Sequence, residues 1–350
     1  MKSGMTIQEL ASELARQQGT KRDFIVNTRS LSFSPDADRL EFMPNSGEGT
    51  PSHTFGMTDL FQRQLADAVS IPTKYYDRLR REDERELLSL NVNRLLFKRE
   101  AKQTVRTLDG VARAFLSDRY RRIDNDQVTA TILPILNQIP DARVESCEIT
   151  SARMYIKIVN PRLESEVRKG DVVQAGVIVS NSEIGLGSLS VMPLVYRLVC
   201  KNGLIVNDLG HRKYHFGREQ EECWDLYGDD TRRADDDAFL MKVADVVKIA
   251  ADEARFGMVV DKLRDAADTK ITAPIDDVIE LTAERFSFNK TETSGILQHL
   301  IEGGDLTMYG LSNAVTRTSQ DVDDYDRATE LERVGWQIIT QGPKLLSEVK

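Results

Sequence analysis

Asp109-Gly110 joins two short apolar stretches near the middle of the chain, and it constrains the fold more than any other local feature. A type I′ turn needs positive φ at both central positions, and Asp-Gly meets this requirement. The run QTVRTLDGVARAFLS therefore predicts a β-hairpin. The apolar spacing in DNDQVTATILPILNQI then predicts a helix, which Asp124 can cap and Pro134 should kink or end.

The segment after this helix alternates as a strand does. In RVESCEITSARMYIKIVN, the side chains of Met154, Ile156 and Ile158 share one face. The other face carries Arg153, Tyr155 and Lys157. Two more strands follow in DVVQAGVIVSNSEIGLGSLSVMPLVYRLVCKNGLIV. The stripe of apolar residues in DDAFLMKVADVVKIAADEARFGMVVDKLRDAAD predicts a long amphipathic helix.

These elements predict an α+β protein with a central antiparallel sheet, in the order hairpin, helix, three strands, long helix. Helical additions flank this core at both ends, beginning with a helix from Thr6 to Gln17 that Thr6 and Glu9 can cap. We predict an N-terminal helical region with short strands (1–93), a central α+β core (94–268) and an acidic helical region (269–350).

Charge is divided unevenly along the 350 residues, whose formal net charge is -9. From Glu219 to the end the chain has 29 acidic and 15 basic residues, whereas residues 1–218 have 27 acidic and 32 basic residues. A polyanion partner would therefore contact the first two thirds of the chain. The alternative is ordinary charge that keeps the surface soluble.

The three cysteines, Cys147, Cys200 and Cys223, include no CxxC pair and predict a reducing compartment. The sequence shows no signal peptide and no apolar run of the roughly 20 residues that span a bilayer, so we expect a cytoplasmic protein without membrane contact. A zinc site built from Cys200, His211, His215 and Cys223 is an alternative, but no known ligand spacing supports it. We therefore expect no metal and no other cofactor.

Enzyme signatures are missing from the sequence: there is no GxxxxGK[ST], GxSxG or HExxH. The glycine-rich stretch EIGLGSLS joins two predicted strands, so a hairpin loop explains it better than a nucleotide site. The predicted strands carry almost no carboxylates of the kind that a metal-dependent nuclease needs. We expect a protein that is not an enzyme, with a metal-dependent nuclease as the open alternative.

Basic residues concentrate between Arg94 and Arg122, where nine of them accompany three acidic residues. If one face of an antiparallel sheet is solvated, such residues form a positive surface with interleaved tyrosines, which suits a single-stranded backbone and stacked bases. The alternative is a solvated face with scattered salt bridges. The candidate nucleic-acid-binding residues are Lys98, Arg99, Lys102, Arg106, Arg113, Arg119, Tyr120, Arg121, Arg122, Arg153, Tyr155 and Lys157.

Four stretches carry a resemblance to a known family: RAFLSDRYRRIDN, SLSVMPLVYRLVCKNGLIV, IPTKYYDRL and LSNAVTRTSQDVDDYDRATELE. They resemble the phage/plasmid-like family of unknown function, and this resemblance implies a mobile element. The predicted core order is also similar to that of RecT/Redβ single-strand annealing proteins. That similarity implies a groove for single-stranded DNA, assembly into rings or filaments, and annealing without a nucleotide or metal.

The expected function is thus single-stranded nucleic-acid binding by an annealing-like recombination protein of a phage or plasmid. Its expected partners are single-stranded DNA, further copies of the chain, and a nuclease or host single-strand-binding protein recruited by the acidic C-terminal third. The alternative is a non-enzymatic counter-defence factor that binds a host protein through its acidic helices.

Overall fold

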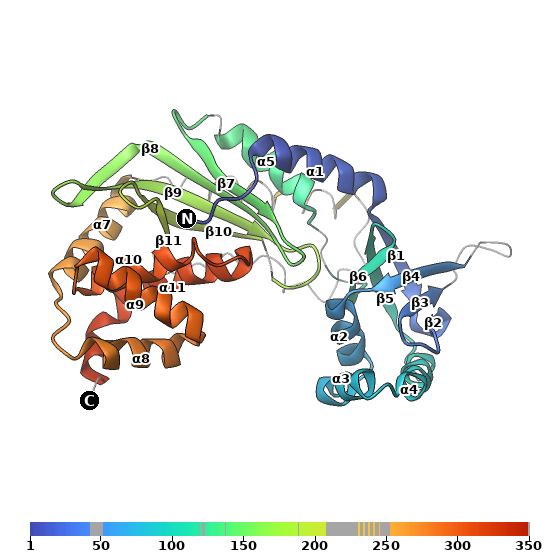
Figure 1. Ribbon diagram of the computed structural model, residues 1–350. Helices are drawn as coiled ribbons and strands as arrows, with labels where there is room; N and C mark the ends of the chain where they lie inside the picture. The colour runs from blue at the N-terminus through green and yellow to red at the C-terminus, as the bar shows by residue number, and fades with distance from the viewer. Residues whose placement is uncertain are drawn as a thin grey trace.

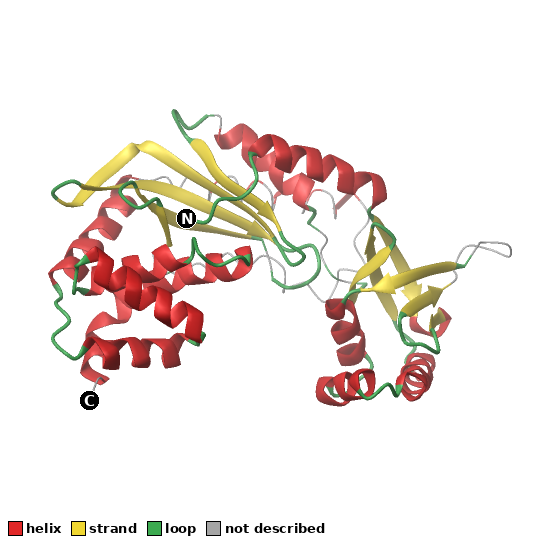
Figure 2. Ribbon diagram, in the orientation of Figure 1, coloured by secondary structure: helices red, strands yellow, loops and turns green. Residues whose placement is uncertain are grey.

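The computed structural model describes residues 1–42, 52–118, 120, 123–136, 138–187, 189–207 and 253–348, with seven further positions between 230 and 245. Helices and strands are mixed throughout, and helices dominate the C-terminal part (Figure 2). The elements are α1 (Ile7–Thr20), β1 (Arg22–Asn27), the 3-10 turn η1 (Thr28–Ser30), β2 (Leu31–Phe33), β3 (Arg39–Phe42), β4 (His53–Met57), α2 (Asp59–Ala68), α3 (Thr73–Arg81), α4 (Arg85–Lys98), β5 (Lys102–Leu108), β6 (Val111–Ser117), α5 (Asn125–Leu136), β7 (Arg143–Ile149), β8 (Met154–Arg168), β9 (Asp171–Asn181), β10 (Ser190–Arg197), β11 (Asn202–Ile205), α7 (Glu253–Asp268), α8 (Ile275–Phe286), α9 (Lys290–Gly303), α10 (Met308–Thr318) and α11 (Tyr325–Glu348).

The first sheet has six strands in the order β1-β5-β6-β4-β3-β2, and helices α2 to α4 lie against it (Figure 1). Its β5–β6 hairpin turns at Asp109 and Gly110, whose φ angles are 51° and 76°. The predicted hairpin is therefore confirmed, with positive φ at both central residues. The pair β4–β6 is parallel, and the other pairs are antiparallel.

The hairpin precedes α5 and the strands β7 to β9 in the chain as predicted, but it belongs to the first sheet and not to the central one. β5 pairs with β1, and β6 pairs with β4, so the hairpin completes a sheet whose other strands come from the first 57 residues. Local turn chemistry identifies a hairpin but says nothing about which distant strands will pair with its two edges. The boundary between residues 93 and 94 stays a prediction, and this sheet has strands on both sides of it.

The second sheet has five antiparallel strands in the order β11-β10-β9-β8-β7. Helices α1 and α5 cover one face, where Leu10 and Leu14 of α1 and Val128 and Ile132 of α5 pack on the sheet (Figure 1). The predicted N-terminal helix is confirmed, because Thr6 and Glu9 exchange the two hydrogen bonds of a capping box. Pro134 lies inside α5, near its C-terminal end.

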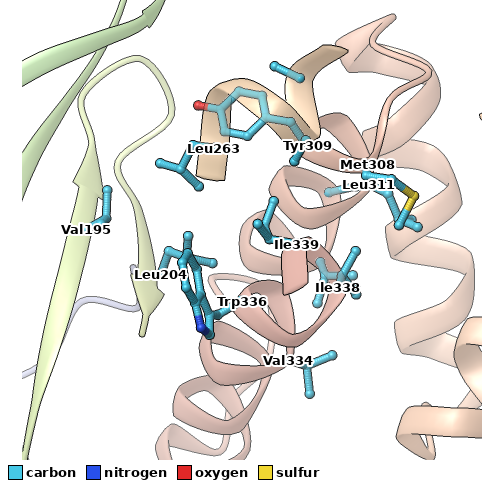
Figure 3. Close-up of a cluster of buried hydrophobic side chains, with 14 of the residues drawn as sticks. Val195, Leu204, Leu263, Met308, Tyr309, Leu311, Val334, Trp336, Ile338 and Ile339 are labelled. Atoms are coloured by element: carbon cyan, nitrogen blue, oxygen red, sulfur yellow. The ribbon is translucent and has the colours of Figure 1, made fainter. Parts of the chain in front are cut away.

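Helices α7, α10 and α11 cover the opposite face of this sheet. Trp336 of α11 is fully buried and packs beside Leu204 of β11 and Leu263 of α7 (Figure 3). The predicted solvated face is therefore wrong, because the C-terminal helices bury it. The α+β class, the antiparallel strands and the helical C-terminal region are confirmed.

The long helix predicted for residues 236–268 is described from Glu253 onward as α7, while most of its first half lies outside the described residues. Across the described parts of the chain, no helix combines the length and apolarity that a bilayer-spanning segment needs.

Candidate nucleic-acid interface

Arg106 of β5, a predicted phosphate ligand, is completely buried. Its guanidinium donates to the carboxylates of Asp23 and Asp124 and, over 2.8 Å, to the backbone oxygen of Glu183. Burial alone would lower the pKa of Arg106, but Asp124 and Asp23 outweigh burial and raise it above the ordinary value. These contacts use three of the five N–H donors, and because the guanidinium is completely buried, a phosphate cannot reach it.

Arg113 of β6 is paired in the same way, since its Nη2 donates to Oε2 of Glu183. Lys21 follows α1 and places its Nζ 3.0 Å from Asp124, 3.4 Å from Asp126 and 3.3 Å from Glu183. We call this ionic network the junction cluster because it joins both sheets and the start of α5. Its members are Lys21, Asp23, Arg106, Arg113, Asp124, Asp126 and Glu183.

Three carboxylates of the junction cluster have oxygens within 4.8 Å of one another: Asp124, Asp126 and Glu183. Oxygen ligands of this kind suit Mg²⁺ or Ca²⁺. The Lys21 ammonium contacts all three, and it supplies the positive charge that such a group of carboxylates needs. Sequence reasoning missed this grouping, since Glu183 lies in a loop 57 residues beyond Asp126. A metal ion would have to compete with Lys21 here.

Tyr155 and Lys157 of β8, two of the predicted nucleic-acid ligands, lie under the C-terminal helices, and Arg153, just before β8, lies beside a loop. Lys157 is fully buried against Glu332, and Tyr155, only 2% exposed, donates to Asp326 over 2.6 Å. Arg153 is half-buried, and its Nη2 donates to the backbone oxygen of Leu186. Lys157 and Tyr155 therefore cannot contact a polynucleotide, and that prediction is corrected here.

Tyr120 is also unsuited to stacking on a base. Its ring lies in a small apolar cluster with Leu116 and Ile184, and its hydroxyl donates to the backbone oxygen of Ser182. Burial raises the pKa of its phenol. The neighbouring predicted residues Arg119, Arg121 and Arg122 lie outside the described residues.

Lys98, Arg99 and Lys102 are the predicted residues that the fold leaves exposed. They lie where α4 ends and β5 begins, and within the described chain none of them forms an ion pair. The turn η1 brings Arg29 to the same place. The guanidinium of Arg29 stands 5.8 Å from the ring centroid of Phe97, and its Nη1 lies 3.0 Å from Glu100.

We call this surface the α4–β5 corner and define it as Arg29, Phe97, Lys98, Arg99, Glu100 and Lys102. It holds four cations and one carboxylate around a phenylalanine ring that is 67% exposed. Hydrogen bonds fix its backbone, because Thr28 bonds through its amide to Ala101 and through its hydroxyl to Arg99. No local sequence pattern indicates that Arg29 and Phe97 belong here, since Arg29 lies in an ordinary turn and Phe97 near a helix end.

The residues described in the structure thus do not form a continuous cationic trough over the central sheet. The predicted set divides into buried, paired cations at the junction cluster and beneath α11, and exposed cations at the α4–β5 corner. The cause is the same throughout: each buried cation meets a carboxylate that the fold brings from a distant segment.

The alternative zinc site rests on residues that the structure describes only in part. Cys200 is half-buried, and its Sγ lies 3.2 Å from Nη1 of Arg197. His211, His215 and Cys223 lie outside the described residues.

Comparison with protein families matches residues 113–222 to a domain of unknown function, DUF932. The matched segment runs from Arg113 of β6 through α5 and the strands β7 to β11, and it includes Asp124, Asp126 and Glu183 of the junction cluster. The α4–β5 corner lies before it. Neither the curated proteins nor the solved structures gave a significant match to the chain.

Proposed function

We propose that this chain binds single-stranded nucleic acid at the α4–β5 corner. The observation that carries the proposal is the group Lys98, Arg99 and Lys102, three exposed cations that have no carboxylate partner among the described residues and lie beside the exposed ring of Phe97. Cations neutralise phosphates, and an exposed aromatic ring stacks on a base of any sequence. The combination suits an unpaired strand better than a duplex, whose bases are already stacked.

The wider proposal is an annealing-like recombination protein of a phage or plasmid, acting in the cytoplasm as a homo-oligomer, with a nuclease or a host single-strand-binding protein as a further partner. Its support is the chain order of hairpin β5–β6, helix α5 and strands β7 to β9, together with the four stretches that resemble the phage/plasmid-like family. This support concerns chain topology and family context, and it does not depend on the residues of the α4–β5 corner.

Fluorescence anisotropy with a labelled single-stranded oligonucleotide across a salt series tests the binding proposal. The affinity of the native chain should fall as salt rises. The triple variant Lys98→Ala/Arg99→Ala/Lys102→Ala should bind more weakly, with a slope of log affinity against log salt that is shallower by about two, since each phosphate contact contributes about 0.7.

The matched control removes the same charge from exposed sites elsewhere, by changing Lys169, Lys270 and Lys290 to alanine. This control should bind like the native chain. Equal loss in both triple variants would mean that net charge, not the α4–β5 corner, governs binding. No binding by the native chain at low salt would reject the proposal outright.

A second candidate function is binding of a host protein, and α4 carries the observation that favours it. Leu87 and Leu90 are 41% and 65% exposed, and Phe97 lies two turns beyond Leu90 on the same side of the helix. Exposed apolar side chains in such a row are typical of protein interfaces. A pull-down from nuclease-treated host lysate should retain a partner in this case, and a Leu87→Ser/Leu90→Ser variant should lose it.

A further inference from the structure

A pocket of about 540 Å³ opens in the N-terminal part of the chain, and its described lining includes none of the predicted binding residues. Helices α2 and α3, the first residue of α4 and the turn between β2 and β3 form its walls. Its volume falls in the range of small-molecule sites. The lining residues are Ala37, Asp38, Asp59, Arg63, Asp77, Arg80, Arg81 and Arg85.

Four arginines and three aspartates line this pocket, and only two of the arginines are paired with carboxylates. Arg80 donates to Asp59 over 3.0 Å, and Arg85 donates to Asp38 over 2.9 Å. These pairs connect α3 to α2, and α4 to the β2–β3 turn, and so hold the walls together.

Arg63 and Arg81 differ from the paired arginines. Both are exposed, and within the described residues neither forms an ion pair. The one hydrogen bond from the Arg81 guanidinium goes to a backbone oxygen of its own helix, that of Asp77. The pocket therefore presents two guanidinium groups without an ion-pair partner among the described residues, together with the carboxylate of Asp77.

The start of α4 lies at one wall of the pocket. The residue before α4, Glu84, makes no side-chain hydrogen bond to the first turn, and Arg85 at the first helical position lines the pocket. An uncapped helix N-terminus carries a partial positive charge and free backbone N–H groups. The alternative interpretation is a solvated network of salt bridges. Such a network does not explain why the wall of a cavity of this size carries two arginines without an ion-pair partner among the described residues.

We propose that this pocket binds a terminal phosphate group, as a phosphate monoester or diphosphate, with Arg63 and Arg81 as its donors. The planar guanidinium matches two phosphate oxygens at once. A terminal phosphate presents three strong acceptor oxygens, so it can engage both arginines at once, whereas a carboxylate presents two. The proposal goes beyond nucleic-acid binding at the α4–β5 corner and does not depend on it.

Isothermal titration calorimetry with pyrophosphate tests the pocket in the full chain. The double variant Arg63→Ala/Arg81→Ala should bind about a hundredfold more weakly, from about tenfold for each guanidinium lost. The control Arg78→Ala/Arg94→Ala removes the same charge from exposed positions on α3 and α4 outside the pocket and should bind like the native chain. Circular dichroism should show both variants folded.

Two further titrations distinguish the possible sources of the phosphate. ADP against adenosine tests a free nucleotide, and a 5′-phosphorylated against a 5′-hydroxyl oligonucleotide tests the end of a strand. The Lys98→Ala/Arg99→Ala/Lys102→Ala variant should bind pyrophosphate normally, so failure at the corner and failure at the pocket are distinguishable. The proposal is overturned if Arg63→Ala/Arg81→Ala and Arg78→Ala/Arg94→Ala bind pyrophosphate equally well. It is also overturned if the native chain does not bind pyrophosphate at millimolar concentration.

Discussion

The Nζ atom of Lys157 lies 2.8 Å from Oε2 of Glu332, and neither side chain is exposed to solvent. The ring of Tyr325, also on α11, stands 4.6 Å from the same Nζ atom. This buried pair joins the middle of β8 to a helix 175 residues later in the chain. In β8, polar and apolar residues alternate as they do in a strand with one solvated face. The buried pair shows how the C-terminal helices can cover that face although it carries a lysine.

Removing one partner of this pair should destabilise the chain strongly. Glu332→Ala leaves Lys157 as an uncompensated buried charge, and such a change typically costs about 3–5 kcal/mol. Urea unfolding followed by circular dichroism should show this loss as a lower midpoint. Burial lowers the pKa of Lys157 despite the neighbouring carboxylate, so the core disfavours the charged form of this side chain.

The double variant Lys157→Met/Glu332→Leu is the informative comparison. It removes both charges and fills similar volume, so it should recover most of the stability that Glu332→Ala loses. Lys169→Ala, at an exposed turn, serves as a control and should unfold like the native chain. A single Glu332→Ala variant with native stability would contradict the buried pair.

The junction cluster should make stability depend on pH in the acid range. Burial would raise the pKa of Asp124, but Arg106 and Lys21 outweigh burial and lower it. Because the unfolded carboxyl has the higher pKa, its contribution is fully present above about pH 4 and is lost as the pH falls through the lowered folded value. Urea midpoints between about pH 3 and 7 should therefore fall less steeply for Asp124→Asn than for the native chain.

Asp268→Asn, at the exposed end of α7, is the control for this measurement and should retain the native pH profile. Identical acid sensitivity in the native chain and in Asp124→Asn would show that Asp124 does not hold its charge through Arg106 and Lys21.

Cys147 should not react with thiol reagents in the folded chain. It is completely buried in β7, and burial raises the pKa of its thiol to about 12, so the reactive thiolate is scarce. In a Cys200→Ser/Cys223→Ser background, Ellman's reagent at about pH 8 should react only after urea is added. Fast reaction without urea would show that Cys147 is accessible at the surface. The native chain, which retains the half-buried Cys200, is measured for comparison.

The local features of this fold could be predicted because they depend on neighbouring residues. The Asp109-Gly110 turn and the Thr6 capping box both appear as expected, since each is set by residues within a few positions of one another. The pairing of β5 with β1 and of β6 with β4 could not be predicted, because it depends on which strands meet across more than 50 residues.

The predicted site residues show the same difference between local features and distant contacts. Lys98, Arg99 and Lys102 are exposed as predicted, because they lie where α4 ends and β5 begins, beyond Leu96, the last buried residue of α4. Arg106 and Lys157 were expected at the surface, and each instead meets a carboxylate from a distant element, Asp23 for one and Glu332 for the other. A basic residue in an apolar strand has the same sequence pattern in both situations, and only the tertiary fold decides between them.

A substitution of Phe97 distinguishes nucleic-acid binding from protein binding by α4 more directly than the removal of a charged residue does. If its ring stacks on a base, Phe97→Ala should weaken oligonucleotide binding by about 1–3 kcal/mol and leave the salt dependence unchanged, since no charge is removed. Leu90→Ala is the matched control, because Leu90 lies on the same helix and is 65% exposed against 67% for Phe97. Anisotropy should separate the two variants if the surface binds a strand, whereas both should lose partner capture if α4 binds a protein. If Phe97→Ala binds the oligonucleotide as tightly as the native chain does, the ring takes no part in binding, and only the cations support the proposed interface.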